Sequence, residues 1–170
     1  MADSPENKNM LSQSGFRLVF DRLPNVTYFS QTSELPRISL QSITHTTPLH
    51  DYPIPGEKLT FDAFNVTFRV DEDMLNFIEL YNWLVGITGV TSSEERRLYE
   101  NQSRNNSIYS DATLIIMSSK YNANLRVKLN DLFPETITGL QFNVTSPDVI
   151  YLEATATFRY RNYSIERVTT

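Results

Sequence analysis

The sequence predicts a mainly β fold, namely an antiparallel β-sandwich or partly open barrel with one flanking α-helix. Apolar and polar residues alternate with a period of two over most of the chain, as in strands with one buried face. Apolar residues follow a helical spacing in one convincing segment, residues 74–85. With 170 residues, 40% of them hydrophobic, the chain can form a core. We expect a flexible N-terminal arm over residues 1–13 and one domain over residues 14–170.

The first predicted elements form a hairpin. Residues 16–20 alternate as a strand, residues 23–25 give a turn around a proline, and residues 26–33 form a second strand. Pro36 has no amide hydrogen to donate to a ladder, so the second strand should end before it.

A longer strand pair follows. Residues 37–50 begin with apolar alternation and then become polar on both faces, which leaves them little core to face. Residues 52–59 contain two prolines and a glycine, which predicts a turn-rich tip. The returning strand, residues 59–70, shifts the parity of its apolar residues at Ala63–Phe64, which predicts a β-bulge there.

The predicted helix begins after three acidic residues, 71–73, whose charge favours the first turn of a helix. Gly86 is expected to end it. Its apolar face would contain Met74, Phe77, Ile78, Tyr81, Leu84 and Val85. The polar residues 88–110 predict a long loop, with a capping box for one short helix at residues 92–95.

The C-terminal part of the chain again predicts strands. Residues 111–119 are almost continuously apolar, which is typical of a strand covered on both sides. Residues 124–130 alternate cleanly and precede an expected turn at residues 132–134. Two further strands are expected at residues 138–146 and 149–163.

Charge and composition argue against several kinds of function. The formal net charge is −5 and no basic run occurs, so the chain lacks the electrostatic features of nucleic-acid or anionic-membrane binding. It has no cysteine for disulfides or zinc ligation. No apolar run approaches the ~20 residues that cross a bilayer. Neither a phosphate-binding glycine loop nor a histidine metal pair is present, so we expect no cofactor and no metal.

Candidate catalytic residues are few. The two histidines, His45 and His50, have no acidic partner of obvious geometry, and we interpret them as surface residues. An enzyme that uses dispersed carboxylates, such as a glycosidase, stays open as an alternative. Its candidate residues are Asp62, Glu79, Glu135 and Glu153. A monomeric β-barrel carrier with an apolar ligand in a Phe/Tyr-rich interior is a further alternative.

The strand pattern itself indicates assembly. The pairs at residues 37–70 and 137–163 are longer than the about 5–6 residues usual for a strand, and long hairpins expose unpaired edges. Edge pairing between identical copies would remove this hazard, and a ring closed by rotational symmetry would leave no edge over. An ordinary monomeric sandwich stays open as well.

An ordered series of motifs resembles the tail tube protein family of contractile-tailed bacteriophages. The series is FRLVF, YFSQTSELPRISL, PIPGEKLTFDAFNVTFRVDED, MLNFIELYNWL, VKLNDLFPETITGLQFNV and IYLEATATFRY. It covers nearly all of residues 14–161 in family order. The arrangement of the GEKLTFD strand, acidic turn, amphipathic helix and Leu-Phe-Pro turn is its most specific part.

This resemblance implies a non-enzymatic virion structural protein, assembled in the host cytoplasm. Strands from each copy would complete an intersubunit β-barrel in a hexameric ring, and stacked rings would form the tail inner tube. The implied partners are further copies of the chain, the tail sheath protein, the baseplate and the tape measure protein. DNA would pass through the lumen without sequence-specific binding. Baseplate tube initiators and tail terminators share the fold and are alternative roles.

By position in the family order, the lumen-lining hairpins would be about residues 38–70 and 137–160. The lumen-lining residues would be Gln141, Asn143, Thr145, Glu153, Thr155 and Thr157. These are neutral or acidic, as expected for a channel in which DNA must slide. Contacts between rings or subunits would come from Asp51, Tyr52, Pro53, Ile54, Pro55, Gly56, Glu57, Arg159 and Arg161.

Overall fold

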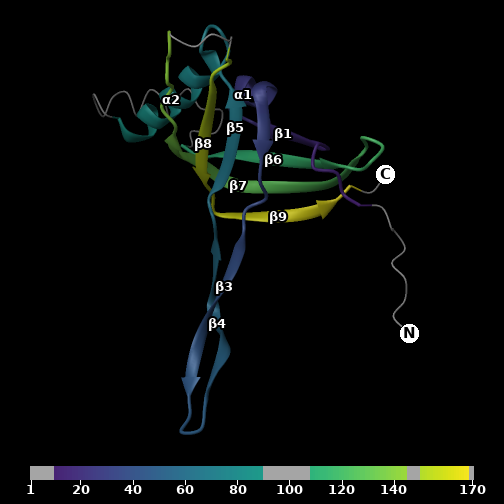
Figure 1. The fold of residues 1–170 in the computed structure, drawn as a ribbon, viewed down its shortest axis with the longest axis vertical. Helices are drawn as coiled ribbons and strands as arrows, with labels where there is room; N and C mark the ends of the chain where they lie inside the picture. The colour runs from purple at the N-terminus through teal and green to yellow at the C-terminus, as the bar shows by residue number, and fades with distance from the viewer. Residues whose placement is uncertain (1–9, 90–107, 145–149, 169–170) are drawn as a thin grey trace.

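The computed structural model describes residues 10–89, 108–144 and 150–168 of the chain, and this part contains nine strands and two helices (Figure 1). The elements are β1 (Phe16–Phe20), α1 (Pro24–Phe29), β2 (Ser30–Ser33), β3 (Ile38–Thr46), β4 (Asp51–Phe61), β5 (Phe64–Arg69), α2 (Leu75–Thr88), β6 (Ser110–Met117), β7 (Ala123–Ile137), β8 (Glu153–Arg159) and β9 (Asn162–Arg167). The mainly β, antiparallel prediction is confirmed, but a second helix accompanies the expected one. Most of the predicted N-terminal arm and of the loop at residues 88–110, including the capping box, lies outside the described residues.

The strands form two separate sheets. The larger has the order β1-β6-β7-β8-β5-β2, with β9 added on β7, and the smaller is the β3–β4 hairpin. In Figure 1, β1, β6, β7 and β9 run across the view, whereas β5 and β8 run nearly at right angles to them. The larger sheet therefore turns a corner and packs against itself in two layers.

Strand β7 makes this corner. Its first part pairs with β9 up to Asn130 and with β6 up to Leu132, and its last part, from Phe133, pairs with β8. Close to this change of partner, Asp131 adopts a φ of 53°, a left-handed conformation that is uncommon for residues other than glycine. Its carboxylate accepts a hydrogen bond from Arg161 at 3.2 Å. The predicted turn at residues 132–134 is therefore wrong, since the chain bends there but stays within one strand.

The core lies between the two layers and α2. Four aromatic rings meet there, with Phe158 at 5.1 Å from Phe20, 6.3 Å from Phe64 and 6.4 Å from Trp83. The Trp83 Nε1–H donates to the Ile108 carbonyl at 3.0 Å, so the buried indole keeps its hydrogen bond. The inward faces predicted for residues 16–20 and for the middle of residues 149–163 are confirmed.

The predicted N-terminal hairpin is wrong. Residues 24–29 form the short helix α1, which begins with Pro24, where a missing amide hydrogen costs nothing. Strand β1 pairs with β6 and β2 with β5, so the two strands lie at opposite edges of the large sheet. Val26 of α1 and Leu23, which directly precedes the helix, are both buried in the core, three residues apart as on one side of a helix.

Helix α2 is confirmed, but it is longer than predicted, and its buried face differs from the predicted one. It ends at Thr88, followed by the C-cap Gly89 with a φ of 58°, rather than at Gly86, which is buried within the helix. Its buried residues are Asn76, Leu80, Trp83 and Gly86, whereas Ile78 and Tyr81 are exposed. The predicted acidic capping is confirmed at Asp71. Its carboxylate accepts hydrogen bonds from the backbone amides of Leu75 and Asn76 at 3.1 and 3.2 Å.

The C-terminal strands differ from the prediction in extent. Residues 138–144 form no strand, and Phe142 and Val144 are exposed instead of buried. The expected strand at 149–163 is two strands, β8 and β9, which pair with different parts of β7. The alternating pattern was correct inside β8, where Ala154 and Phe158 face the core.

Candidate assembly surfaces

The β3–β4 hairpin extends away from the rest of the protein (Figure 1). Its turn lies at residues 47–50, where Thr47 Oγ1 donates to the His50 carbonyl at 2.6 Å. The predicted turn-rich tip at residues 52–59 is therefore wrong. Pro53 and Pro55 lie within β4, opposite Thr44 and Ser42. An edge strand tolerates proline where its missing amide hydrogen would point to solvent.

The parity shift at Ala63–Phe64 has a different cause from the predicted bulge. There the chain leaves the hairpin and enters β5 of the large sheet. The hairpin's own register shift lies between Leu40 and Ser42. The parity shift therefore indicated the correct position of an irregularity, but it did not show that the chain passes there from one sheet to the other.

The hairpin exposes apolar side chains that have no core to enter. In the part of the chain that the structure describes, no other strand pairs with its outer edges. Its exposed apolar residues are Ile38, Leu40, Ile43, Leu49, Tyr52, Ile54 and Leu59. A lone two-stranded hairpin is marginal in water, and a long apolar edge is a template for another chain. The hairpin is therefore a candidate interface.

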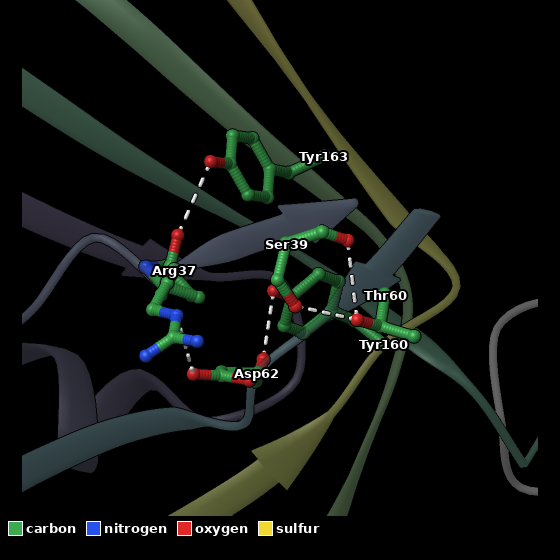
Figure 2. A network of polar contacts seen from close by, with 7 residues as sticks. Arg37, Ser39, Thr60, Asp62, Tyr160 and Tyr163 are labelled. Carbon is green, nitrogen blue, oxygen red and sulfur yellow. Dashed lines mark hydrogen bonds and ion pairs between the residues drawn. The ribbon is translucent and has the colours of Figure 1, made fainter. Parts of the chain in front are cut away.

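At its root the hairpin joins the body through a cluster of aromatic and polar side chains (Figure 2). Tyr160 OH donates to the Asp62 carbonyl at 2.9 Å, and Tyr163 OH donates to the Pro36 carbonyl at 3.2 Å. The Phe61 ring lies 6.0 Å from the ring of Tyr160 and 5.6 Å from that of Tyr163. Burial, together with the nearby Tyr163 and Asp62, raises the pKa of Tyr160 to about 12.

The solvent side of β5 and β8, which we name the polar face, carries three cross-strand pairs. Thr67 hydrogen-bonds Thr155 at 3.0 Å, and Thr157 Oγ1 donates to Asn65 Oδ1 at 3.0 Å. In the third pair, Arg69 lies 3.8 Å from Glu153. All three pairs are directly opposite each other in the register of β5 and β8.

The polar face contains half of the residues predicted to line the lumen. Glu153, Thr155 and Thr157 lie there together, on the side opposite to the core residues of β8. Gln141 and Asn143 lie on the irregular segment 138–144. Thr145 lies outside the described residues. Sequence reasoning missed Arg69, the cation of this face, although its place two residues after Thr67 on the same strand face would have indicated it.

The predicted contact residues fall into two places. Residues 51–57 lie in β4, in the exposed outer half of the hairpin. The two arginines pair within their own chain: Arg159 Nε donates to Glu135 at 2.7 Å, and Arg161 contacts Asp131 at 3.2 Å.

A second exposed apolar group lies at the other end of the molecule. It consists of Phe142, Val144, Ile150 and Tyr151, which we name the far-end patch. In Figure 1, segments 138–144 and 150–152 lie at the top with α2, and the hairpin turn lies at the bottom. Exposed apolar groups therefore mark both ends of the long axis.

The four carboxylates considered for catalysis are each held by a different partner. Asp62 lies 4.0 Å from Arg37, Glu135 pairs with Arg159, Glu153 pairs with Arg69, and Glu79 accepts from Asn25 Nδ2 at 2.6 Å. None of these contacts joins two carboxylates. His45 and His50 are exposed, as predicted, and both rings lie near that of Tyr52. None of the described helices is both long and apolar enough to span a bilayer.

Glu79 lies on α2, and its carboxylate contacts Asn25 of α1. Its Oε2 atom is buried and has no hydrogen-bond partner among the described residues. Burial raises the pKa of Glu79, an effect that the Asn25 hydrogen bonds oppose and the charge of Asp71 increases. Between pH 4.5 and this raised pKa the native state binds more protons than the unfolded state, so stability falls as pH rises.

We therefore expect Glu79→Gln to remove this part of the pH dependence. At pH 7 the free energy of unfolding of the variant should exceed that of the parent by up to about 0.5 kcal/mol, after allowance for solvent screening. The reason is that glutamine places no charge at this partly buried position. Below pH 4 the advantage should vanish. Urea unfolding from pH 3 to pH 7 measures this, with the exposed Glu166→Gln as control. A parallel pH profile for parent and Glu79→Gln would contradict the assignment.

Comparison with known proteins adds independent findings. A family model described as phage tail tube protein matches residues 4–166. A search of curated proteins returned no significant match.

Solved structures share the fold over almost the whole chain. A chain of the anti-feeding prophage tube terminating cap is similar with a TM-score of 0.62 and 14% identity, covering 98% of this chain and 97% of that one. A chain of the sheath–tube complex of the extracellular contractile injection system PVC gives a TM-score of 0.61 at 15% identity, with 95% and 94% covered. A chain of the sheath/tube terminator of PVC gives 0.58 at 16% identity, with 98% and 99% covered.

Proposed function

The chain belongs to the phage tail tube protein family, and from this premise we propose that it is a virion structural protein whose copies form hexameric rings that stack into a tail inner tube. The observation that carries the proposal is the β3–β4 hairpin, which exposes apolar side chains and two unpaired edges within the described residues. Such a hairpin is explained if other copies cover it.

Ring closure would use the edges of the large sheet. Strands β1 and β2 are its two ends, and each has one side without a strand partner in the described part of the chain. Pairing between neighbouring copies would continue the sheet around a closed circle and complete an intersubunit β-barrel.

The polar face is proposed to line the channel. Its groups are hydroxyls, an amide and one ion pair, and Arg159 next to it is neutralised by Glu135. Because each arginine already faces a carboxylate, phosphates of passing DNA would find little net positive charge. Thr155, Thr157 and Glu153 are proposed as lumen residues from their place on the polar face, and Gln141, Asn143 and Thr145 are proposed from their positions in the sequence.

Ring stacking is proposed to be head-to-tail. The outer half of the hairpin, including residues 51–57, would contact the far-end patch of a copy in the next ring, since apolar groups lie at both ends of the long axis. A heterologous contact of this type propagates into a filament. The further partners would be sheath, baseplate and tape measure proteins.

A second role, a tube terminator, has its own support. The structures of similar fold include chains from a tube terminating cap and from a sheath/tube terminator, at coverage as high as that for the sheath–tube complex. A terminator would form one ring that does not stack on itself.

Electron microscopy of the purified protein tests the proposal. We expect rings and, above a threshold concentration, stacked tubes in negative stain, and a symmetric reconstruction should place Thr155 and Thr157 on the channel wall. Single rings at every concentration would favour the terminator. A protein that stays monomeric even with a tail baseplate present as nucleus would overturn the proposal and favour the carrier alternative.

A further inference from the structure

The hairpin is held to the body at its two chain crossings. Pro36 lies two residues before β3, and Asp62 immediately follows β4. The carbonyl of each accepts one phenol hydrogen bond, from Tyr163 and Tyr160 respectively (Figure 2). The body therefore contacts one backbone carbonyl on each side of the hairpin root.

The same two tyrosines enclose an aromatic side chain of the hairpin. The plane of the Phe61 ring makes an angle of 62° with the ring of Tyr160 and of 65° with that of Tyr163. The two tyrosine rings lie 6.1 Å apart. Edge-to-face packing of this type has a preferred geometry, so it resists rotation of the hairpin about its root.

Two further polar contacts at the root stay within the hairpin. The Arg37–Asp62 ion pair and the Ser39–Thr60 hydroxyl bond connect its two sides to each other. They keep the root closed. The direction of the hairpin relative to the large sheet is left to the chain crossings and to the tyrosines.

We propose that Tyr160 and Tyr163 are positioning residues, a tyrosine clasp that sets the direction of the β3–β4 hairpin before a second copy binds it. The proposal rests on the proposed function. At about 3.3 Å per residue, β4 spans about 35 Å, so a rotation of about 10° at the root moves the tip by about 6 Å. A hairpin fixed in advance loses less conformational freedom on binding, which favours assembly.

The phenol groups are needed for this role, not only the rings. Phenylalanine would pack in a similar way but would leave both carbonyls without their donor. A tyrosine hydroxyl is protonated at neutral pH, and the raised pKa of Tyr160, about 12, extends the pH range over which this donor is present.

Spin labelling tests the clasp directly, because the chain has no native cysteine. Labels at His50→Cys in the hairpin turn and Ser164→Cys in β9 report the distance between tip and body. The test variant is Tyr160→Phe/Tyr163→Phe. The control variant is Tyr28→Phe/Tyr81→Phe, which changes two tyrosines with exposed fractions of 82% and 55% that lie in α1 and α2 instead of at the hairpin root. Near-UV circular dichroism selects a temperature at which all variants are folded.

We expect the distance distribution of the monomer to broaden at least twofold in Tyr160→Phe/Tyr163→Phe and to stay unchanged in the control. The threshold concentration for assembly of the unlabelled test variant should rise at least fivefold. A parent-like distribution in the test variant would overturn the clasp, and so would a broad distribution with parent-like assembly. If the parent itself never assembles, the proposed function fails, and with it the role in assembly, whereas the distance data still decide whether the tyrosines orient the hairpin.

Discussion

Replacing Ile43 with Lys and Ile54 with Glu is expected to abolish tube formation at concentrations at which the parent assembles, with the fold unchanged. The two isoleucines are directly opposite each other in β3 and β4, with exposed fractions of 53% and 37%. Covering them in an interface would contribute about 1 kcal/mol each. Losing both should raise the threshold concentration about 30-fold or more, since charges would also have to be desolvated. Sedimentation across a concentration series measures the threshold.

Opposite charges are chosen so that the hairpin itself survives. A Lys–Glu pair across two strands attracts, so strand pairing is retained while the apolar surface is lost. The matched control is Ile43→Val/Ile54→Val, which keeps an apolar β-branched pair and should assemble at nearly the parent threshold. Tubes of the Lys/Glu variant at the parent threshold would show that this part of the hairpin is not an interface.

The largest loss of stability is expected for Phe158→Ala. Phe158 is fully buried and its ring meets those of Phe20, Phe64 and Trp83, which come from β1, β5 and α2. Its removal leaves a cavity where both sheet layers and the helix meet. We expect a loss of about 3–5 kcal/mol in the free energy of unfolding, measured by urea denaturation.

Phe142→Ala provides the control for this change in side-chain size. Phe142 has an exposed fraction of 73%, so its truncation should change the stability of the protomer by less than about 0.5 kcal/mol. Equal losses for the two variants would mean that the ring cluster around Phe158 does not form the centre of the core. Phe142→Ala should still weaken assembly, because Phe142 belongs to the far-end patch.

The sequence by itself determined the mainly β class, the position of α2 and the inward faces of β1, β5 and β8. These features depend on local periodicity, and a buried strand or helix face must be apolar wherever it packs. The family motifs also depend on these local patterns, since they follow the order of the same elements. The match of the family model over residues 4–166 confirms the family. The polar face could be predicted in part for the same reason, because Thr155 and Thr157 alternate with Ala154, Ala156 and Phe158.

Only the tertiary structure decided which strands pair and where they change partner. The apolar side chains of the hairpin strands and of residues 138–144 alternate like those of core strands, yet Leu59 and Phe142 are exposed. Alternation predicts that one face of a strand will be buried, but it does not predict whether that face packs against the same chain or against another copy. The turns at residues 23–25, 52–59 and 132–134 failed for a related reason. Proline and glycine restrict backbone angles locally, whereas partner strands, an edge position and the bend at Asp131 decide whether the chain reverses there.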